Sequence, residues 1–300
     1  MIYSKDLKEY ELLDMANGEK LENWNGVILI RPDPQIIWSK KTYPDLWNMA
    51  SARYIRSNTG GGYWEKYKKV PDSWSIGYKN LKFNLKLMGF KHTGLFPEQA
   101  ANWDFMIDKI KKRMDSGKTA KVLNLFAYTG AASIACAYAG AQVCHVDSSQ
   151  GMVTWAKENA KISNLEDKPI RYIIDDVVKF VEREIRRGNK YDGIIMDPPS
   201  YGRGKKGEIW NISKDLENLI YLCSKILSDD CMFFIVNTYS EGYSGTIIQN
   251  ILRLGLNLPD FNNITTNEIG LKMKDSPVLL PCGVTTIYQR WFNIKSKYKC

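Results

Sequence analysis

The chain has 300 residues, of which 44% are hydrophobic and 25% charged, and its formal net charge at pH 7 is +9. This composition excludes a disordered or fibrous chain and allows one or two domains with a sizeable core. The sequence has no apolar run of membrane-spanning length and no signal-peptide pattern at its start, so we expect a cytoplasmic protein. Six cysteines without a C-x-x-C pair and two histidines predict neither a zinc site nor a disulfide scaffold.

The first third of the sequence predicts short strands separated by turns. Residues 27–30 are strand-like and lead into the turn residues 31–34, and a triple glycine at 60–62 marks another turn. At 81–87 apolar and polar residues alternate, which is typical of a half-buried strand. We therefore predict a small β-rich accessory domain over residues 1–92.

Positive charge is concentrated in this same part of the chain. From Arg53 to Lys91 the sequence contains nine Lys or Arg residues and two acidic residues, which gives a local net charge of +7. Aromatic residues are interleaved with them: Tyr54, Tyr63, Trp64, Tyr67, Trp74, Tyr78, Phe83 and Phe90. Cations with stacking surfaces favour a nucleic-acid interface, most clearly at residues 53–69, whereas the strand at 81–87 equally fits a plain solvated face.

After residue 102 strands and helices alternate. A helix at 103–114 is followed by strands at 121–126, 142–147, 170–174, 193–197 and 231–237, then by strand-like segments at 264–271 and 284–292. Helices are predicted between them at 131–138, 150–162, 177–187, 213–227 and 245–254. This alternation indicates an α/β fold, a doubly wound, Rossmann-like sheet of seven strands over residues 93–300.

The ends of the predicted strands carry the candidate ligand-binding residues. The loop after the first strand has only Gly130 and lacks G-x-G-x-x-G, so it is poorly built for a pyrophosphate. Asp147 ends the second strand and can accept hydrogen bonds from two ribose hydroxyls, and Asp176, after the third, can bind an adenine amino group. An aspartate at such a junction can also cap a helix, which we favour for Asp175. A nucleoside without phosphate indicates S-adenosylmethionine.

Four motifs together resemble a known family. These are L-N-L-F-A-Y-T-G at 123–130, H-V-D at 145–147, D-D at 175–176 and D-P-P-S-Y-G-R-G at 197–204, with G-L-F-P-E-Q upstream at 94–99. Over about residues 90–292 they resemble class I S-adenosylmethionine-dependent methyltransferases related to bacterial large-subunit ribosomal-RNA methyltransferases. The resemblance implies a cofactor-closing segment at 94–99 and an N-terminal domain that helps to bind RNA. It also implies a cofactor set: Phe96, Gln99, Tyr128 and Gly130 at the methionine side, Asp147 at the ribose and Asp176 at the adenine.

The fourth motif, at 197–204, contains the candidate catalytic residues. Methyl transfer is an in-line displacement that needs alignment and removal of a proton, and Asp197 with the Pro198 carbonyl offers acceptors for a base amino group. Tyr201 can stack on a flipped base. The following segment, residues 201–210, can form a mobile lid that meets phosphate, or a plain solvated loop.

Two differences from the motifs of related methyltransferases limit which substrate atom can be methylated. Ser200 separates Pro-Pro from the aromatic residue, and residues 236–240 lack the cysteine that cytosine C5 methylation needs. Cys223 and Cys231 fit buried positions, which leaves Cys282 as a weak nucleophile candidate. We therefore expect methylation at a base nitrogen of RNA. A methyltransferase acting on a protein side-chain amide or a small molecule, and a non-catalytic RNA-binding module, are the alternatives.

Overall fold

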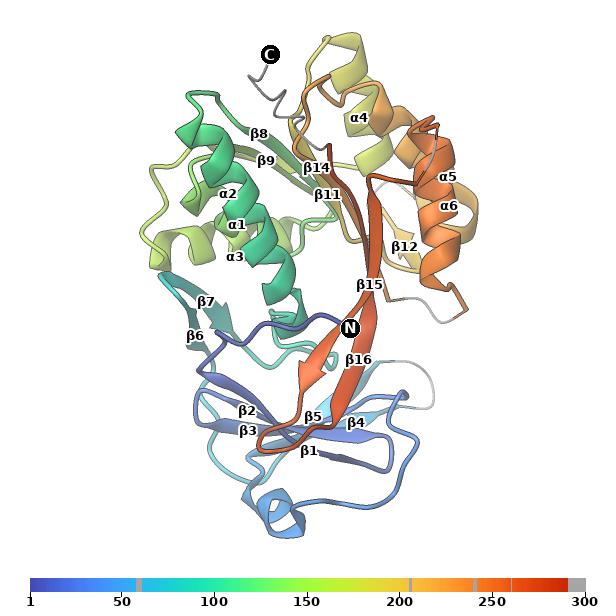
Figure 1. Ribbon diagram of the computed structural model, residues 1–300. Helices are drawn as coiled ribbons and strands as arrows, with labels where there is room; N and C mark the ends of the chain where they lie inside the picture. The colour runs from blue at the N-terminus through green and yellow to red at the C-terminus, as the bar shows by residue number, and fades with distance from the viewer. Residues whose placement is uncertain (58–60, 205–206, 240–241, 260, 291–300) are drawn as a thin grey trace, which may run out of the picture.

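The computed structural model describes residues 1–57, 61–204, 207–239, 242–259 and 261–290. Its largest element is the predicted seven-stranded sheet, whose first five strands in spatial order are parallel (Figure 1). Strands β11 (Gly193–Met196) and β14 (Phe233–Thr238) are buried along their whole length, as expected of strands covered on both faces. In spatial order the strands are β10 (Ile170–Ile174), β9 (Gln142–Asp147), β8 (Lys121–Leu125), β11 (Gly193–Met196), β14 (Phe233–Thr238), β16 (Leu279–Tyr288) and β15 (Ile264–Lys272).

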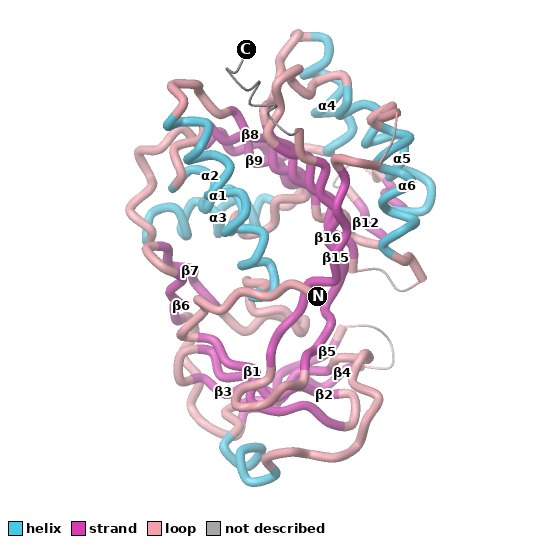
Figure 2. Tube along the Cα trace, viewed as in Figure 1, coloured by secondary structure: helices cyan, strands magenta, loops and turns pink. Residues whose placement is uncertain are grey.

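Helices cover both faces of this sheet, so the predicted doubly wound fold is confirmed (Figure 2). One face carries α1 (Ala100–Asp115), α2 (Ala131–Tyr138) and α3 (Gln150–Ile162), and the other carries α4 (Val177–Arg186), α5 (Ile212–Ser224) and α6 (Gly245–Gly255). The chain runs outward from β8 to β10 and then returns to β11 on the other side of β8. The carboxyl ends of β8 and β11 therefore form the switch point at which ligands bind in such sheets.

The predicted β-rich part consists of two pieces. A five-stranded sheet contains β1 (Tyr10–Ala16), β2 (Glu19–Trp24), β3 (Val27–Pro32), β4 (Ala52–Arg56) and β5 (Gly62–Lys66) in that order. The hairpin of β6 (Trp74–Tyr78) and β7 (Leu81–Leu85) docks on α3, where the Trp155 indole N–H donates to the Asn84 carbonyl at 3.1 Å. A division of the chain at residue 92 stays a prediction.

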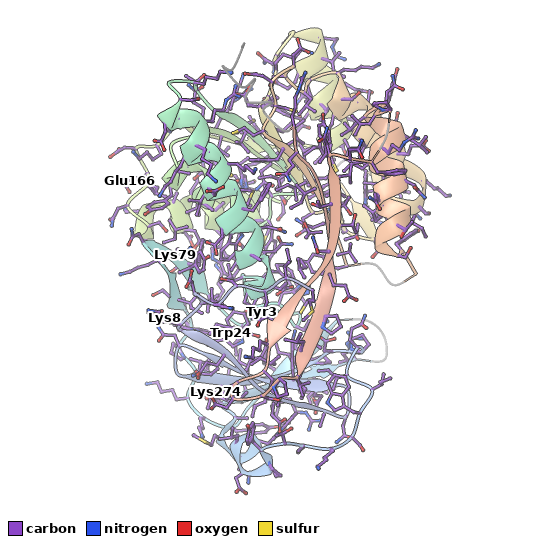
Figure 3. The ribbon with its side chains drawn as sticks, viewed as in Figure 1. Tyr3, Lys8, Trp24, Lys79, Glu166 and Lys274 are labelled. Atoms are coloured by element: carbon purple, nitrogen blue, oxygen red, sulfur yellow. The ribbon has the colours of Figure 1, made fainter. Side chains whose placement is uncertain are left out.

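The N-terminal sheet is joined to the large sheet by long strands. The hairpin of β15 and β16 extends beyond the large sheet, and isolated bridges pair Leu12 with Met273 and Ile2 with Ile269. Figure 3 places Tyr3 and Trp24 at the level where the two sheets meet. Apolar residues of both sheets share one core there. The described helices include none long and apolar enough to cross a bilayer.

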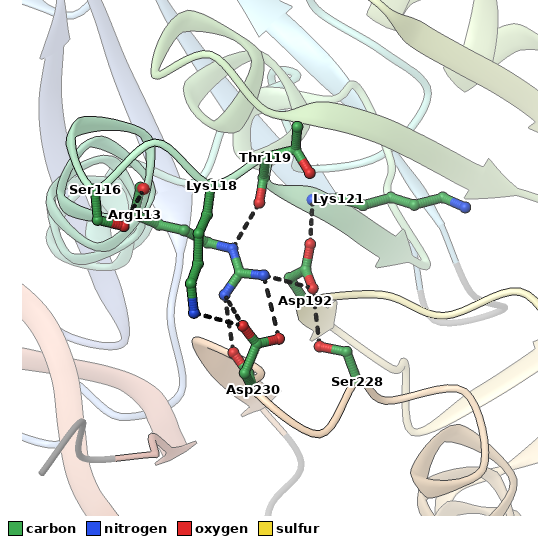
Figure 4. A network of polar contacts seen from close by, with 8 residues as sticks. All are labelled: Arg113, Ser116, Lys118, Thr119, Lys121, Asp192, Ser228 and Asp230. Atoms are coloured by element: carbon green, nitrogen blue, oxygen red, sulfur yellow. Dashed lines mark hydrogen bonds and ion pairs between the residues drawn. The ribbon is translucent and has the colours of Figure 1, made fainter.

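A polar network holds the opposite end of the large sheet (Figure 4). The buried Arg113 guanidinium, at the end of α1, donates to the Thr119 carbonyl at 2.6 Å and pairs with Asp192 at 3.0 Å and Asp230 at 3.2 Å. Asp192 in turn accepts from the Lys121 backbone N–H at 2.9 Å. One guanidinium thereby ties α1 to the beginnings of β8 and β11, far from the switch point.

Candidate functional site

The loop after β8 has an unusual backbone. Phe126, Tyr128 and Gly130 all have positive φ angles, of 54°, 50° and 84°. The backbone of an aromatic residue rarely adopts this left-handed region, because it is strained there. Such backbone strain persists where surrounding contacts enforce it. Here the Tyr128 N–H donates to an Asp147 carboxylate oxygen at 2.8 Å. The loop is therefore shaped from the neighbouring strand β9.

Two glycines allow segments to approach this loop closely. A Cβ at Gly130 would lie 2.8 Å from the Cβ of Ala156 in α3, and one at Gly94, whose φ is 104°, would collide with the Trp155 ring. The Thr129 hydroxyl donates to the Gly94 carbonyl at 2.6 Å. The segment 94–99 is thereby fixed against the loop. This position agrees with the cofactor-closing role that the resemblance implies for the segment.

Asp147 is half-buried at the end of β9. Its two carboxylate oxygens accept the backbone N–H groups of Tyr128 and Ser149, each at 2.8 Å. Burial raises the pKa of the carboxyl, against the lowering effect of the two N–H donors. Each carboxylate oxygen can accept a second hydrogen bond, so the group can shape the loop and still bind two hydroxyls.

A cavity of about 60 Å³ lies beneath the loop. Of the predicted site residues its lining contains Phe96, Gln99, Tyr128, Gly130 and Asp197. The cavity is smaller than the roughly 300 Å³ of a typical small-molecule site, so it can enclose only one end of a nucleoside ligand. The Tyr128 hydroxyl is buried and has no hydrogen-bond partner among the described residues. A buried unpaired hydroxyl is costly unless a ligand binds it.

Gln99 is fixed by a set of side chains that were not predicted from the sequence. The Gln99 amide N–H donates to the Tyr239 hydroxyl at 2.6 Å, and its carbonyl oxygen accepts from Asn102 at 2.8 Å. Asn102 also donates to Asn237 at 2.9 Å. Asn237 is the penultimate residue of β14 and Tyr239 follows the strand, so their position at a strand end was the signal that could have identified them.

Asp197 follows β11 at the edge of the cavity. It is half-buried, and no described residue donates a hydrogen bond to its carboxylate. Burial, reinforced by the nearby negative charge of Glu98, raises the pKa of Asp197 to about 8. The next residue, Pro198, is buried. The carboxylate is thus an acceptor that lacks a donor and favours a ligand able to supply one.

The two aspartates after β10 differ from our interpretation. Asp176, rather than Asp175, is the N-cap of α4, and its carboxylate accepts from the Lys179 N–H at 3.0 Å. Asp175 instead pairs with Arg183. The cap uses one oxygen of Asp176, so adenine binding by its other oxygen remains a prediction.

The segment after the D-P-P motif is a hairpin rather than an irregular loop. Strands β12 (Tyr201–Arg203) and β13 (Ile209–Asn211) pair, and the Trp210 indole donates to the Pro199 carbonyl at 2.7 Å. Tyr201 is 51% exposed and does not line the cavity. Lys205 and Lys206, which belong to the predicted lid, lie outside the described residues. Whether Tyr201 stacks on a base stays a prediction.

The described cysteines considered as nucleophiles differ in exposure. Cys223 and Cys231 are buried as predicted, and Cys282 is half-buried, with its thiol 3.6 Å from the Leu280 carbonyl. Burial, together with Glu98, raises the pKa of the Cys282 thiol well above its ordinary value. A raised pKa disfavours the thiolate that a nucleophile requires. The described residues also contain no cluster of three or more His, Cys, Asp or Glu that could hold a metal ion.

Comparisons with known proteins show the family and the fold. Residues 54–234 match the family described as S-adenosylmethionine-dependent methyltransferases. The crystal structure of an S-adenosylmethionine-dependent methyltransferase from Agrobacterium tumefaciens is similar, with a TM-score of 0.89 and 31% identity over 96% of this chain and 92% of that one.

Two relatives carry names that include a substrate. Ribosomal RNA large subunit methyltransferase K of Neisseria meningitidis is 27% identical over 79% of this chain and 68% of its own length. Ribosomal RNA large subunit methyltransferase K/L of Pseudoalteromonas atlantica is 29% identical over 76% of this chain. The chain spans 30% of that longer protein.

Proposed function

Because the chain belongs to the S-adenosylmethionine-dependent methyltransferase family, we propose that it methylates a nitrogen atom of a base in ribosomal RNA. The observation that carries the choice of a nitrogen is the Asp197 carboxylate, which lies half-buried beside the cavity and receives no hydrogen bond from the described residues. An amino group can supply the missing donor. The choice of RNA is supported by the names of the two relatives and by the charge of the N-terminal part.

The proposed cofactor residues fit an amino-acid tail and a nucleoside. Phe96, Gln99, Tyr128 and Gly130 surround the cavity, toward which the methionine end would point, and the unpaired Tyr128 hydroxyl can bind there. Outside the cavity, Asp147 would hold the ribose hydroxyls through its remaining lone pairs. The uncapped oxygen of Asp176 would accept from the adenine amino group. S-adenosylmethionine supplies an electrophilic methyl group on a sulfonium, which leaves as a neutral thioether.

In the proposed reaction Asp197 and the Pro198 carbonyl position the acceptor nitrogen. Two N–H groups donated to these oxygens would direct the nitrogen lone pair at the methyl carbon. As the N–C bond forms and the S–C bond breaks, positive charge develops on the nitrogen, and a nearby carboxylate stabilises it. The nitrogen then loses a proton, which the ionised Asp197 would accept. Tyr201 would stack on the base from the adjoining hairpin.

A salt titration distinguishes an RNA substrate from a protein amide or a small molecule. Binding of a polyanion releases counterions, so the affinity for RNA should fall steeply as potassium chloride rises from 50 to 200 mM. A neutral substrate shows little dependence on salt. We expect the steep dependence with unmethylated ribosomal RNA as the probe. Binding that is insensitive to salt would argue against an RNA substrate.

A further inference from the structure

The segment that joins β7 to residues 94–99 lies across one face of the N-terminal sheet. Donors of this sheet bind three of its carbonyls: the Trp64 indole binds Met88 at 2.8 Å, the Tyr54 hydroxyl binds Gly89 at 3.3 Å, and Arg31 binds Lys91 at 3.1 Å. These bonds fix the backbone of the segment. Its side chains are therefore presented in a set direction without further ordering.

A row of aromatic rings runs from this segment to the cofactor loop. The ring centroids of Phe90 and His92 lie 5.9 Å apart, those of His92 and Phe96 5.1 Å, and those of Phe96 and Tyr128 5.6 Å. Phe90, at the outer end, is 42% exposed. Burial and neighbouring cations, Arg31 first among them, lower the pKa of His92 to about 4, so its ring is neutral at pH 7. Neutral rings in a row offer stacking surfaces for bases.

Four cations lie beside this row, and two of them have carboxylate partners. Lys91 is half-buried near Lys20, Arg31 and Arg56, and burial followed by these charges lowers its pKa. Glu22 binds Arg31 through two hydrogen bonds of 2.5 and 2.7 Å, and Lys20 pairs with Asp33 at 3.1 Å.

Lys91 and Arg56 are the remaining cations of this group. Neither forms an ion pair within the described residues. The Lys91 ammonium donates to the Pro32 carbonyl at 3.4 Å. Two positive charges that are not engaged in an ion pair within the described residues, beside a row of rings, match the phosphates of a nucleic-acid strand.

The register of β4 and β5 separates these residues from the rest of the basic region. Tyr54 lies opposite Trp64, so Arg56, two residues on, shares the face that holds the segment. Arg53 points to the other face, where it binds Glu19 through bonds of 2.8 and 2.9 Å. Lys68 donates to the Met49 carbonyl at 2.7 Å. Part of the predicted basic surface is thus already used within the protein.

We propose that Arg56, Phe90, Lys91 and His92, here called the aromatic–basic strip, bind the single-stranded RNA next to the methylated nucleotide. Phe90 and His92 would stack on bases, and Lys91 and Arg56 would bind the phosphates between them. This inference rests on the proposed function, because it supplies the substrate contacts outside the cofactor cavity. The aromatic row would lead the strand toward Phe96 and the methyl donor.

The test measures binding of a fluorescein-labelled, 20-nucleotide single-stranded RNA of mixed sequence by fluorescence anisotropy. Phe90→Ala should weaken binding about tenfold or more, and Phe90→Trp should retain it, because a base stacks on either aromatic ring. Lys91→Gln should make the slope of log affinity against log salt shallower by about 0.7, the value for one phosphate contact on a single strand. Tyr67→Ala and Lys68→Gln are matched controls, since Tyr67 is 49% exposed and both residues lie outside the strip.

All four variants with a removed group should keep the wild-type melting temperature and affinity for S-adenosylhomocysteine. Wild-type RNA binding by Phe90→Ala and Lys91→Gln, or an equal loss in the two control variants, would overturn the proposal of the aromatic–basic strip alone. A wild-type protein that neither binds RNA nor methylates it would overturn the proposed function, and the strip with it.

Discussion

Replacing Asp197 with asparagine tests the central chemical proposal. The substitution keeps the size of the side chain but replaces one acceptor oxygen by an NH₂ group, which cannot accept a hydrogen bond from the substrate amine. No described residue donates a hydrogen bond to the Asp197 carboxylate. The substitution therefore removes an acceptor for the substrate and breaks no hydrogen bond within the described part of the protein. We expect turnover to fall about 10²- to 10⁴-fold, equivalent to about 3–5 kcal/mol of barrier.

The pH dependence gives the same proposal a second readout. With a pKa near 8, Asp197 is mostly protonated at pH 6, and only its ionised form can take up the proton that the substrate nitrogen loses. Therefore kcat/KM should increase as pH rises through 8 and then level off. Glu98→Gln removes the negative charge that contributes to the raised pKa, so the midpoint should move to lower pH.

The stability of the folded chain should change with pH in the direction opposite to kcat/KM. The folded pKa of Asp197 exceeds that of an unfolded aspartate, so the folded chain loses stability as pH rises from the ordinary aspartate range to about 8. Asp197→Asn has no such charge. The variant should melt higher than the wild type at pH 8.5, with a smaller difference at pH 5.

Single-turnover transfer of a tritiated methyl group measures the rate, and calorimetry with S-adenosylhomocysteine measures cofactor affinity. The account predicts a large loss of rate with cofactor affinity unchanged. Asp175→Asn is a control, because this aspartate pairs with Arg183 and does not line the cavity. A rate within threefold of wild type in Asp197→Asn, or a loss confined to cofactor affinity, would refute the reasoning.

Three further substitutions test other parts of the account. Asp147→Ala should weaken S-adenosylhomocysteine binding by about 2–3 kcal/mol in calorimetry, and unchanged affinity would exclude the ribose assignment. Tyr201→Ala should raise the KM for RNA by the equivalent of about 1–3 kcal/mol, the value of one stacked base, without affecting cofactor affinity. Arg113→Ala should lower the free energy of unfolding in urea by about 3 kcal/mol, because Asp192 and Asp230 lose their buried partner. Bonds from Lys118 and Arg113 lower the pKa of Asp230, so this difference should shrink as pH falls through the ordinary aspartate range.

The parallel part of the fold was predictable because each element has clear sequence boundaries. The strand predicted at 142–147 and the helix predicted at 131–138 coincide with β9 and α2. The last strand was placed at 284–292, but β16 begins at Leu279, before Pro281 and Gly283. Proline is excluded from a central strand because it cannot donate a backbone hydrogen bond. However, β16 is a central strand only from Val284 onward, where it pairs with β14. Pro281 therefore lies where the strand is locally an edge, beside the bulge of β15.

The site was predicted less completely, because sequence shows which residues end a strand but not where their side chains point. Asp147 and Asp197 lie at the expected strand ends. Of the neighbouring aspartates at 175 and 176, only the dihedral angles of the helix start decide which one caps α4. The contact of Gln99 with Tyr239 joins residues 140 positions apart and has no local pattern. The register of β4 and β5 likewise decides which cations of the basic region remain unpaired.

The central claim is tested most directly by methyl transfer to RNA from a strain that lacks this protein. Purified protein would be incubated with that RNA and S-adenosylmethionine carrying a deuterated methyl group, and the digested nucleosides would be analysed by mass spectrometry. The account predicts one labelled nucleoside from ribosomal RNA with the methyl group on a base nitrogen. Label in 5-methylcytidine, or label in protein or small molecules with none in RNA, would contradict it.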